Sequence, residues 1–255
     1  MLWLELEGAV NIRDIGGLPT DDGGSTARNR LLRADNLQDL SQTDVAYLVG
    51  TIGLSTVVDL RTASEVASEG PGPLTKYDHV AHVHHSLLPD HARDATQPDA
   101  LLTQRREDRE RYDGDHMSAH YLGYVEQRPD SIVGALRAIA GSPGAALVHC
   151  AAGKDRTGVI VAFALSVAGA RRDAIVRDYA ATAERIEAIL ERLLATTTYA
   201  ADVAKVSLDR HTPRPESMAE FLEQVDARYG GVHEWLQANG FTADETAGLR
   251  AKLRN

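Results

Sequence analysis

The sequence predicts an α/β protein with a central, mostly parallel sheet flanked by helices and a helix-rich C-terminal part. Two short apolar runs, residues 54–60 and 145–149, are typical of buried strands. Helical periodicity surrounds the second run, and strands that alternate with helices favour a sheet covered on both faces. Helical patterns dominate after residue 170. The 255 residues contain no long linker, so we expect one domain over residues 1–255.

The N-terminal half combines tight turns with short strands and a short helix. Paired glycines at 16–17 and 23–24 mark loops. Ser41 followed by Asp44 is close to a capping box and starts a short helix. Strands are predicted at 54–60 and 77–85, and the charged stretch 99–127 is predicted to be helical.

The second half of the chain is predicted to form one strand and a series of helices. Apolar residues at helical spacing precede the strand at 145–149 and follow it. Thr242 and Glu245 form a capping box that starts the last helix. The helices predicted are 132–139, 156–168, one long amphipathic helix over 175–193, and three shorter ones at 216–228, 232–239 and 242–253.

Composition excludes several classes of protein. With 27 Lys and Arg against 37 Asp and Glu, the net charge of −10 argues against nucleic acid or an anionic membrane as main partner. A single cysteine excludes an internal disulfide. No Sec-type signal opens the chain, and the apolar run 159–168 is too short to cross a bilayer. We therefore expect a cytoplasmic protein without stable membrane insertion, although export that needs no N-terminal signal would leave no trace. The oligomeric state is not indicated.

The stretch that carries chemistry is His149-Cys150-Ala151-Ala152-Gly153-Lys154-Asp155-Arg156-Thr157-Gly158, between a predicted strand and a predicted helix. Five residues between cysteine and arginine can form a loop whose backbone N–H groups face a tetrahedral anion, next to the positive end of a helix. Arg156 can hold two phosphate oxygens at once. The residues expected to bind the phosphate are Ala151, Ala152, Gly153, Lys154, Arg156 and Thr157.

The same donors favour the thiolate of Cys150, which makes this residue a nucleophile at neutral pH. The hydroxyl of Thr157 could bond to the sulfur and stabilise it as the leaving group of a second step. The alternative for Cys150 is a small buried apolar residue at a strand end, and the alternative for Arg156 is a surface cation.

This stretch resembles the signature loop of cysteine-dependent protein tyrosine phosphatases, and its Gly-Lys-Asp-Arg-Thr-Gly ending resembles the bacterial tyrosine/serine phosphatase group. The resemblance implies a tyrosine-phosphatase-like fold and a phosphomonoesterase that forms a phosphocysteine, which water then hydrolyses. It implies no metal and no cofactor. Other stretches similar to this group are Asn11-Ile12-Arg13-Asp14-Ile15-Gly16-Gly17, Leu32-Arg33-Ala34-Asp35, Val57-Val58-Asp59-Leu60-Arg61, Tyr229-Gly230-Gly231-Val232 and Trp235-Leu236.

The resemblance also bears on substrates. Phosphotyrosine is the expected group, and a lysine at position 154 is similar to the signature loops of phosphoinositide phosphatases. Phosphoserine, phosphothreonine and phosphoinositides are therefore possible substrates, and the partners are phosphorylated proteins or phosphoinositides. The alternative for Lys154 is a solvated side chain at a loop tip.

Two aspartates compete for the role of general acid. Asp155 lies inside the signature loop, at the position suggested for the group that the chain resembles, and we favour it. Leu88-Pro89-Asp90 partly matches the Trp-Pro-Asp sequence of other tyrosine phosphatases, so Asp90 is one alternative, and the other is that neither aspartate is the acid. The predicted catalytic set is Cys150, Arg156 and Asp155.

Remaining clusters are interpreted as support for the site. Arg13 with Asp14, and Asp59 with Arg61, are expected to form scaffolding ion pairs, and direct contact with substrate is the alternative. Helices within 90–127 could fold over the site as a lid, or form a static solvated helix. Histidines at 79, 82, 84 and 85 favour solvent-facing or pocket-lining roles over zinc.

Two other functions compete with the phosphatase. One is a phosphate-binding module without turnover, which the retained Cys150 and Arg156 disfavour. The other is a sulfur-transfer or arsenate-reducing enzyme, which typically has a different loop length or a second cysteine.

Overall fold

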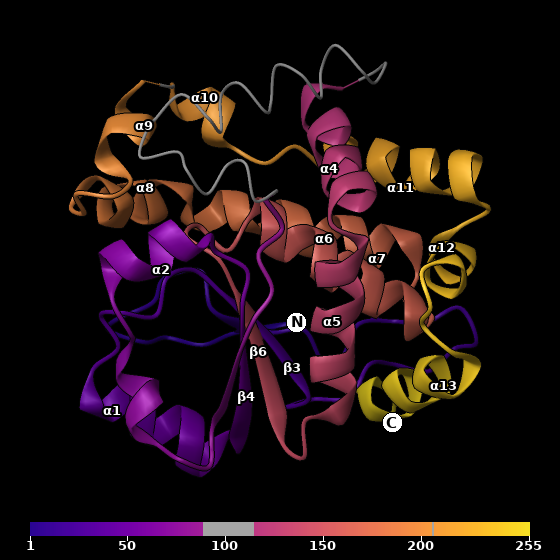
Figure 1. Cartoon of the computed structure of the whole chain (residues 1–255), viewed down its shortest axis with the longest axis horizontal. Helices are drawn as coiled ribbons and strands as arrows, with labels where there is room; N and C mark the ends of the chain where they lie inside the picture. Colours follow the sequence, from indigo (N-terminus) through magenta and orange to yellow (C-terminus); the bar gives the residue numbers. More distant parts are fainter. Residues whose placement is uncertain (89–114, 206) are drawn as a thin grey trace.

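A computed structural model describes residues 1–88, 115–205 and 207–255 (Figure 1). Its sheet has the strand order β1-β2-β3-β6-β4-β5. The pairs β3–β6, β6–β4 and β4–β5 are parallel, whereas β1–β2 and β2–β3 are antiparallel. The strands are β1 (Leu2–Trp3), β2 (Arg13–Asp14), β3 (Leu31–Ala34), β4 (Leu54–Asp59), β5 (Ala81–His84) and β6 (Ala145–His149). The predicted α/β class with a mostly parallel sheet is confirmed.

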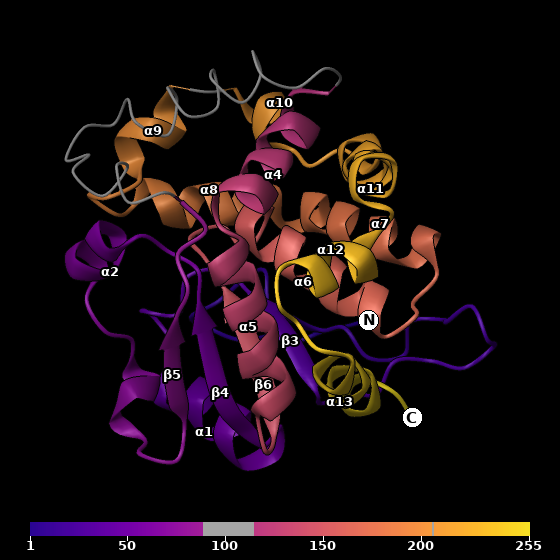
Figure 2. The same ribbon diagram turned by 45° about the vertical axis from the view of Figure 1, so that its right-hand side comes forward.

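Helices cover both faces of this sheet. The described helices are α1 (Gln42–Ala46), α2 (Ala63–Glu69), α4 (His116–Gln127), α5 (Pro129–Gly141), α6 (Asp155–Val167), α7 (Arg172–Ala181), α8 (Ile186–Leu194), α9 (Ala200–Ala204), α10 (Leu208–His211), α11 (Pro215–Tyr229), α12 (Val232–Ala238) and α13 (Ala243–Leu253). Figure 1 shows α1 and α2 on one side of the strands, and α5 with α11, α12 and α13 on the other. Figure 2 shows α5 lying along the strands on that second side.

The alternation of side chains along the strands divides the interior into two clusters. On β6, Ala146 and Val148 belong to the larger cluster with α4 to α7 and α11 to α13. Their neighbours Ala145 and Leu147 belong to the cluster that contains Val45 of α1. Successive strand residues point to opposite faces, and both faces of β6 are apolar because both are covered.

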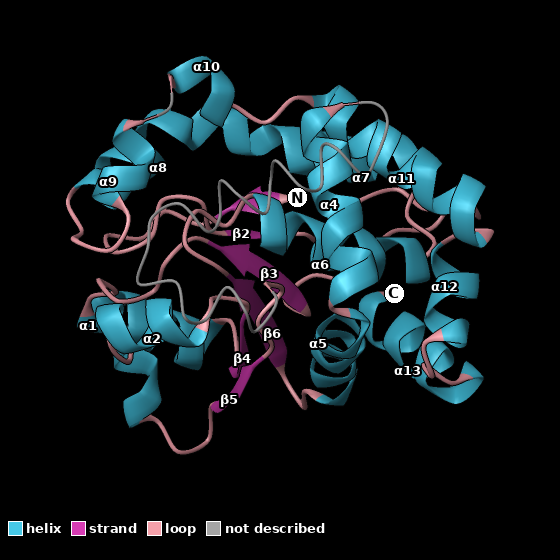
Figure 3. Cartoon of the chain, turned by 45° about the horizontal axis from the view of Figure 1, so that its top comes forward, coloured by secondary structure: helices cyan, strands magenta, loops and turns pink. Residues whose placement is uncertain are grey.

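The carboxyl ends of β3, β6 and β4 meet at one edge of the sheet. The register pairs Ala34 with His149, and His149 with Asp59. Figures 1 and 3 show α8, α9 and α10 above this edge. In open α/β sheets, ligands bind at such an edge, and the stretch 150–154 begins there.

The structure corrects some expected elements. The single helix predicted over 175–193 is wrong, because a 3-10 turn at Thr182–Arg185 separates α7 from α8. The two parts bury their apolar faces in different clusters, which one straight helix could not do. The helices α9 and α10 and the strands β2 and β3 had no clear periodic signal, because each is at most five residues long.

Several predictions fall on residues outside the described ones. Asp90 and most of the predicted lid lie within 89–114. The end of the predicted helical stretch is described, as α4 (His116–Gln127). Within the described ranges no helix combines the length and apolar character needed to span a membrane.

Candidate active site

The signature loop connects β6 to α6 and curls against the end of β3. Gly153 has φ +64, and a Cβ atom built there would lie 2.4 Å from the carbonyl oxygen of Ala34. Glycine alone accommodates both the left-handed backbone and this close approach. Cys150 is 2% exposed, yet it lines a cavity of about 140 Å³ together with Lys154 and Arg156.

Neighbouring groups bind the carbonyl oxygens of the loop from outside. The backbone N–H of Asn36 donates to the carbonyl oxygen of Ala151 at 2.9 Å. The side chain of Asn11 donates to the carbonyl of Ala152 at 2.8 Å. Gly153 presents its carbonyl to the guanidinium of Arg33 at 2.7 Å. Because the C=O and N–H of a trans peptide unit point in opposite directions, these bonds leave the amides facing the inside of the loop.

A buried ion network holds these outer groups in place. Asp178 of α7 lies between two arginines, 2.9 Å from Nε of Arg13 and 2.7 Å from Nη1 of Arg33. Burial alone would raise the pKa of Asp178, but the two guanidinium groups hold it below its ordinary value. Arg13 also donates to Asn11, so the network continues to the loop.

The predicted pair between Arg13 and Asp14 is therefore wrong. The two residues are adjacent on strand β2, so their side chains point to opposite faces. Asp14 instead accepts hydrogen bonds from the amides of Gly16 and Asn29.

The side chain of Arg156 is fixed by Glu65 of α2. Two hydrogen bonds of 2.6 and 2.9 Å join the guanidinium to the carboxylate in a bidentate pair. Burial would lower the pKa of Arg156, but the charges of Glu65 and Cys150 hold it well above its ordinary value. The alternative of a surface cation is wrong, because Arg156 is buried.

Asp155 is the first residue of α6, and a chain of two tyrosine hydroxyls leads to its carboxylate. Tyr121 donates to Oδ1 of Asp155 at 2.6 Å. The hydroxyl of Tyr179 lies 2.6 Å from that of Tyr121. A phenol carries one proton, and that of Tyr121 goes to the carboxylate, so Tyr179 donates to Tyr121. The carboxylate therefore has a set orientation beside the cavity that it lines.

Lys154 is buried rather than solvated, which rules out the loop-tip alternative. Its Nζ donates to the carbonyl of His211 at 2.7 Å and lies 3.6 Å from Asp155. The lysine thus connects the loop to α10. It also lines the cavity, so its charge acts on whatever anion the loop holds.

The hydroxyl of Thr157 does not make the contact that was expected of it. It lies in the first turn of α6 and is fully buried, but its hydroxyl has no hydrogen-bond partner among the described residues. The expected bond to the sulfur of Cys150 is therefore not formed in this conformation.

One wall of the cavity is apolar and comes from α8. Four aliphatic side chains form this wall, and they pack with Ala151 of the loop. These four are Ile186, Ile189, Leu190 and Leu193. A wall of this kind beside an anion site suits an ester whose leaving group is an aromatic ring.

Tyr199 packs against the same cluster, and its hydroxyl lies near Arg156. Burial, with the nearby charge of Glu65, raises the pKa of Tyr199 well above its ordinary value, while Arg156 opposes the shift. The hydroxyl is buried and has no hydrogen-bond partner within the described part of the chain. It is therefore a protonated donor whose bond no residue of the described ranges takes.

The predicted pair of Asp59 and Arg61 is confirmed, with Nη2 and Oδ2 2.6 Å apart. Arg61 also donates to Asn36 at 2.9 Å, the residue that holds the carbonyl of Ala151. Burial would raise the pKa of Asp59, but His149 and Arg61 hold it well below its ordinary value. The pair thus supports the loop, as expected.

The histidines show no metal-binding arrangement. Within the described ranges, no three His, Cys, Asp or Glu side chains are grouped so that they could hold a metal ion. His82 and His84 line a second cavity, as the pocket-lining interpretation expects.

Glu65, Tyr121 and Asp178 were missed by sequence reasoning. Thr62 and Glu65 have the spacing of a capping box, and the structure shows that box at the start of α2. That signal predicts the start of a helix but not the ion pair with Arg156. Tyr121 and Asp178 are far from the loop in sequence and carry no local signal.

Known proteins resemble the chain over nearly its whole length. The sequence profile described as tyrosine phosphatase family matches residues 4–255. A Mycobacterium tuberculosis protein named triple specificity protein phosphatase PtpB is 29% identical over 280 residues, covering 98% of each chain. A Nostoc commune protein named tyrosine-protein phosphatase is 28% identical over 233 residues, covering 87% of this chain and 73% of that protein.

Proposed function

The chain belongs to the tyrosine phosphatase family and is a protein-tyrosine phosphatase, and on this premise we propose that it hydrolyses phosphate monoesters through a phosphocysteine on Cys150. The observation that carries the proposal is the convergence of Cys150, Arg156 and the inward amides of the loop on one cavity. A phosphoryl group with three charged oxygens fits such a set of donors.

In the first step the thiolate of Cys150 attacks phosphorus, so that a P–S bond forms while the P–O bond to the leaving group breaks. Arg156 and the amides of residues 151–156 stabilise the charge on the three equatorial oxygens. In the second step water attacks the phosphocysteine, and the sulfur leaves as a thiolate. The bidentate bond with Glu65 keeps Arg156 in one orientation through both steps.

Asp155 is proposed as the group that protonates the leaving oxygen and later takes a proton from water. Its place at the cavity and its bond from Tyr121 support this role. The negative charge of a bound phosphate favours a protonated neighbour. Asp90, which lies outside the described residues, remains the alternative.

For substrates we propose phosphotyrosine, with phosphoserine, phosphothreonine or phosphoinositides as further candidates. The aliphatic wall from α8 supports an aromatic ester. Lys154 places a second cation at the loop, and the word "triple" in the name of the mycobacterial relative supports broad specificity.

The test is hydrolysis of p-nitrophenyl phosphate by the wild-type protein and by Cys150→Ser. We expect turnover in the first and none in the second, with a ³²P-labelled intermediate trapped only on the cysteine protein. Phosphate binding by both proteins without turnover by either would instead support a binding module. Rates on phosphotyrosine, phosphoserine and phosphoinositide substrates then rank the substrate classes.

The general acid is tested by pH–rate profiles of Asp155→Asn and Asp90→Asn. We expect the asparagine at 155 to slow the release of a poor leaving group and to remove the limb of the profile that reports the acid. If Asp155→Asn keeps that limb of the pH–rate profile and Asp90→Asn loses it, the general acid is Asp90.

We further propose that residues 1–255 form one phosphatase domain that acts in the cytoplasm. The family match over residues 4–255 supports the first part. So does the packing of the C-terminal helices in the same cluster as strand residues of β4 and β6. Limited proteolysis and cell fractionation test the two parts.

A further inference from the structure

Helix α8, which forms the apolar wall of the cavity at Cys150, has a small apolar attachment to the rest of the protein. Its three buried residues belong to a cluster separate from the two at the faces of the sheet, and the other buried members among the described residues are Ala151 and Val203. An element with few buried apolar contacts shifts at a low cost in free energy. The ion pair of Arg185 with Glu5, just before α8, is largely exposed and contributes little. The position of α8 therefore depends on further polar contacts.

Arg192 of α8 makes such contacts. Its Nη1 donates to Oδ2 of Asp35 at 2.8 Å, and its Nη2 donates to the carbonyl oxygen of Asn36 at 3.2 Å. Nη2 also donates at 3.0 Å to Oδ2 of Asp39, an exposed carboxylate. The side chain of Asp35 is 3% exposed, so solvent screens its pair with the guanidinium only weakly. Arg192 thus ties α8 to the segment that follows β3.

Asp35 connects the helix to the signature loop by one route. Besides the guanidinium of Arg192, its carboxylate accepts the backbone N–H of Val10 at 3.2 Å and that of Asn11 at 3.0 Å. The side chain of Asn11 in turn donates to the carbonyl oxygen of Ala152 at 2.8 Å. Burial raises the pKa of Asp35, whereas the charge of Arg192 opposes the rise and favours the carboxylate that accepts these bonds.

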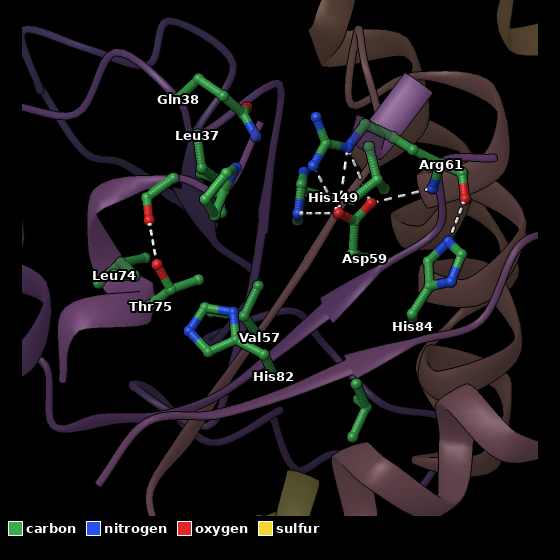
Figure 4. Close-up of a pocket in the computed structure, with 14 residues that line it drawn as sticks. Leu37, Gln38, Val57, Asp59, Arg61, Leu74, Thr75, His82, His84 and His149 are labelled. Carbon is green, nitrogen blue, oxygen red and sulfur yellow. Dashed lines mark hydrogen bonds and ion pairs between the residues drawn. The ribbon is translucent and has the colours of Figure 1, made fainter. Parts of the chain in front are cut away.

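Asn36 connects them by a second route. Its carbonyl accepts from Arg192, and its backbone N–H donates to the carbonyl oxygen of Ala151. Arg61 donates to the side-chain oxygen of Asn36 at 2.9 Å, and Figure 4 shows the bonds by which Asp59 fixes Arg61. The two residues that follow β3 are thus tied both to the loop and to α8. We infer that this short segment sets the distance between the apolar wall and the loop.

The cavity between the wall and the loop has a volume of about 140 Å³. A cavity of roughly 150 Å³ lined by aliphatic residues holds benzene, so this one has room for a single ring. Arg192 does not itself line the cavity. We propose that Arg192, by fixing α8 on Asp35 and Asn36, sets the width of the cavity for one aromatic ring and is a positioning residue for substrate choice. The position of α8 is independent of the proposed function, and only the choice among esters rests on it.

Hydrogen exchange tests whether Arg192 fixes α8. Arg192→Met keeps the apolar stem of the side chain and removes all three of its hydrogen bonds. We expect the amides of α8 to exchange at least about tenfold faster in the full-length variant, while those of α5 stay within about twofold of wild type. The control is Arg177→Met, which removes an exposed arginine of α7 and should leave α8 unchanged. Unchanged exchange of α8 in Arg192→Met would overturn the proposal.

Calorimetry with two ligands tests the width of the cavity without any turnover. Inorganic phosphate needs only the loop, whereas benzylphosphonate also places one ring against the wall and cannot be hydrolysed as an ester. In Arg192→Met we expect the dissociation constant of benzylphosphonate to rise about fivefold or more and that of phosphate to stay within about twofold. An equal change for both ligands, or no change for either, contradicts a role in width.

A milder variant keeps the test open if Arg192→Met fails to fold. Arg192→Lys keeps a charge beside Asp35 but loses the planar fork that also reaches Asn36 and Asp39. It should raise the dissociation constant of benzylphosphonate about twofold to threefold relative to that of phosphate. In a folded Arg192→Met protein, the same lysine should restore most of the lost binding when it replaces the methionine. A ratio of the two constants equal to wild type in every folded variant would refute the proposal.

Turnover gives the readout that rests on the proposed function. Phenyl and 1-naphthyl phosphate have leaving groups of similar acidity but differ by one ring. We expect the wild type to prefer phenyl phosphate about tenfold or more in kcat/KM, and Arg192→Met to prefer it about threefold or less, with kcat on phenyl phosphate nearly unchanged. A loss confined to kcat would instead assign Arg192 to the chemical step and overturn the proposal. Absence of turnover by the wild type would count against the proposed function, while exchange and calorimetry still decide the role of Arg192.

Discussion

Single side chains far apart in sequence determine the geometry around Cys150. Arg156 is oriented by Glu65, and Asp155 by Tyr121, across 91 and 34 residues respectively. Each contact is a charge-assisted hydrogen bond in a buried place, where such bonds are strong. Removing either partner therefore tests orientation rather than contact with substrate.

Glu65→Gln removes the charge that fixes Arg156 while keeping the shape of the side chain. A buried hydrogen bond between charged groups contributes about 1.5–3 kcal/mol. We therefore expect kcat/KM to fall by roughly ten to a hundredfold. Glu223→Gln, on the exposed face of α11, is the control and should stay within about threefold of wild type. Equal losses in the two variants would mean that the loss does not come from the bidentate pair.

Tyr121→Phe removes the donor that orients Asp155. An acid matters most for a poor leaving group, so we expect kcat to fall about tenfold for phenyl phosphate and little for p-nitrophenyl phosphate. The partly buried Tyr229, which bonds to Glu126, provides the control as Tyr229→Phe. A uniform loss on both substrates would show that Tyr121 serves the fold and not the acid.

Tyr199→Phe deletes a buried hydroxyl that has no partner within the described ranges. If bound phosphate or peptide takes this donor, the variant should show a KM raised about threefold to tenfold and a stability equal to or above wild type. Kinetics and urea unfolding measure the two quantities. A loss of stability with unchanged KM would mean that the hydroxyl is used in the fold.

At the scale of elements, the loop depends on the strand that backs it. Three successive carbonyl groups of the loop are bonded by residues in or next to β2 and β3. These residues are Asn36, Asn11 and Arg33, which bond to residues 151, 152 and 153 in that order. Closeness to β3 also requires glycine at 153. The loop of residues 150–156 therefore depends on β3 as much as on β6.

Gly153→Ala forces a Cβ against the carbonyl of Ala34 in a left-handed conformation. We expect a loss of about 1–3 kcal/mol in the free energy of unfolding, with nearly complete loss of activity. Gly248→Ala in α13 meets no atom within 4 Å and should raise stability by up to about 1 kcal/mol with full activity. Urea unfolding and turnover check both variants, and an active Gly153→Ala would refute the close approach.

At the scale of the whole molecule, buried titratable groups make stability depend on pH. Burial lowers the pKa of His149 from 6.5 to about 4. Between these values the unfolded chain binds a proton that the folded chain does not, so stability falls as pH decreases. The loss attributable to His149 is complete near pH 4 and amounts to at most about 3 kcal/mol.

Urea unfolding at about pH 7, 5.5 and 4.5 measures this dependence. His149→Asn should show a flatter profile over the interval. Glu65 and Asp178, whose pKa values are also lowered in the folded state, act in the same direction at still lower pH. An identical slope in His149→Asn would show that another group carries the dependence.

The loop between Cys150 and Arg156, the strand and helix on either side of it, and the class of fold could all be predicted from the sequence, because each rests on neighbouring residues. A run of apolar residues, a capping box or a Cys-to-Arg spacing is read within one segment. The side chains that hold that loop, in contrast, could not be predicted from any single segment. Glu65 on Arg156, Tyr121 on Asp155, and Asp178 between two arginines depend on how distant segments pack. The same holds for the turn that divides α7 from α8, since its cause is that the two helices bury their faces in different clusters.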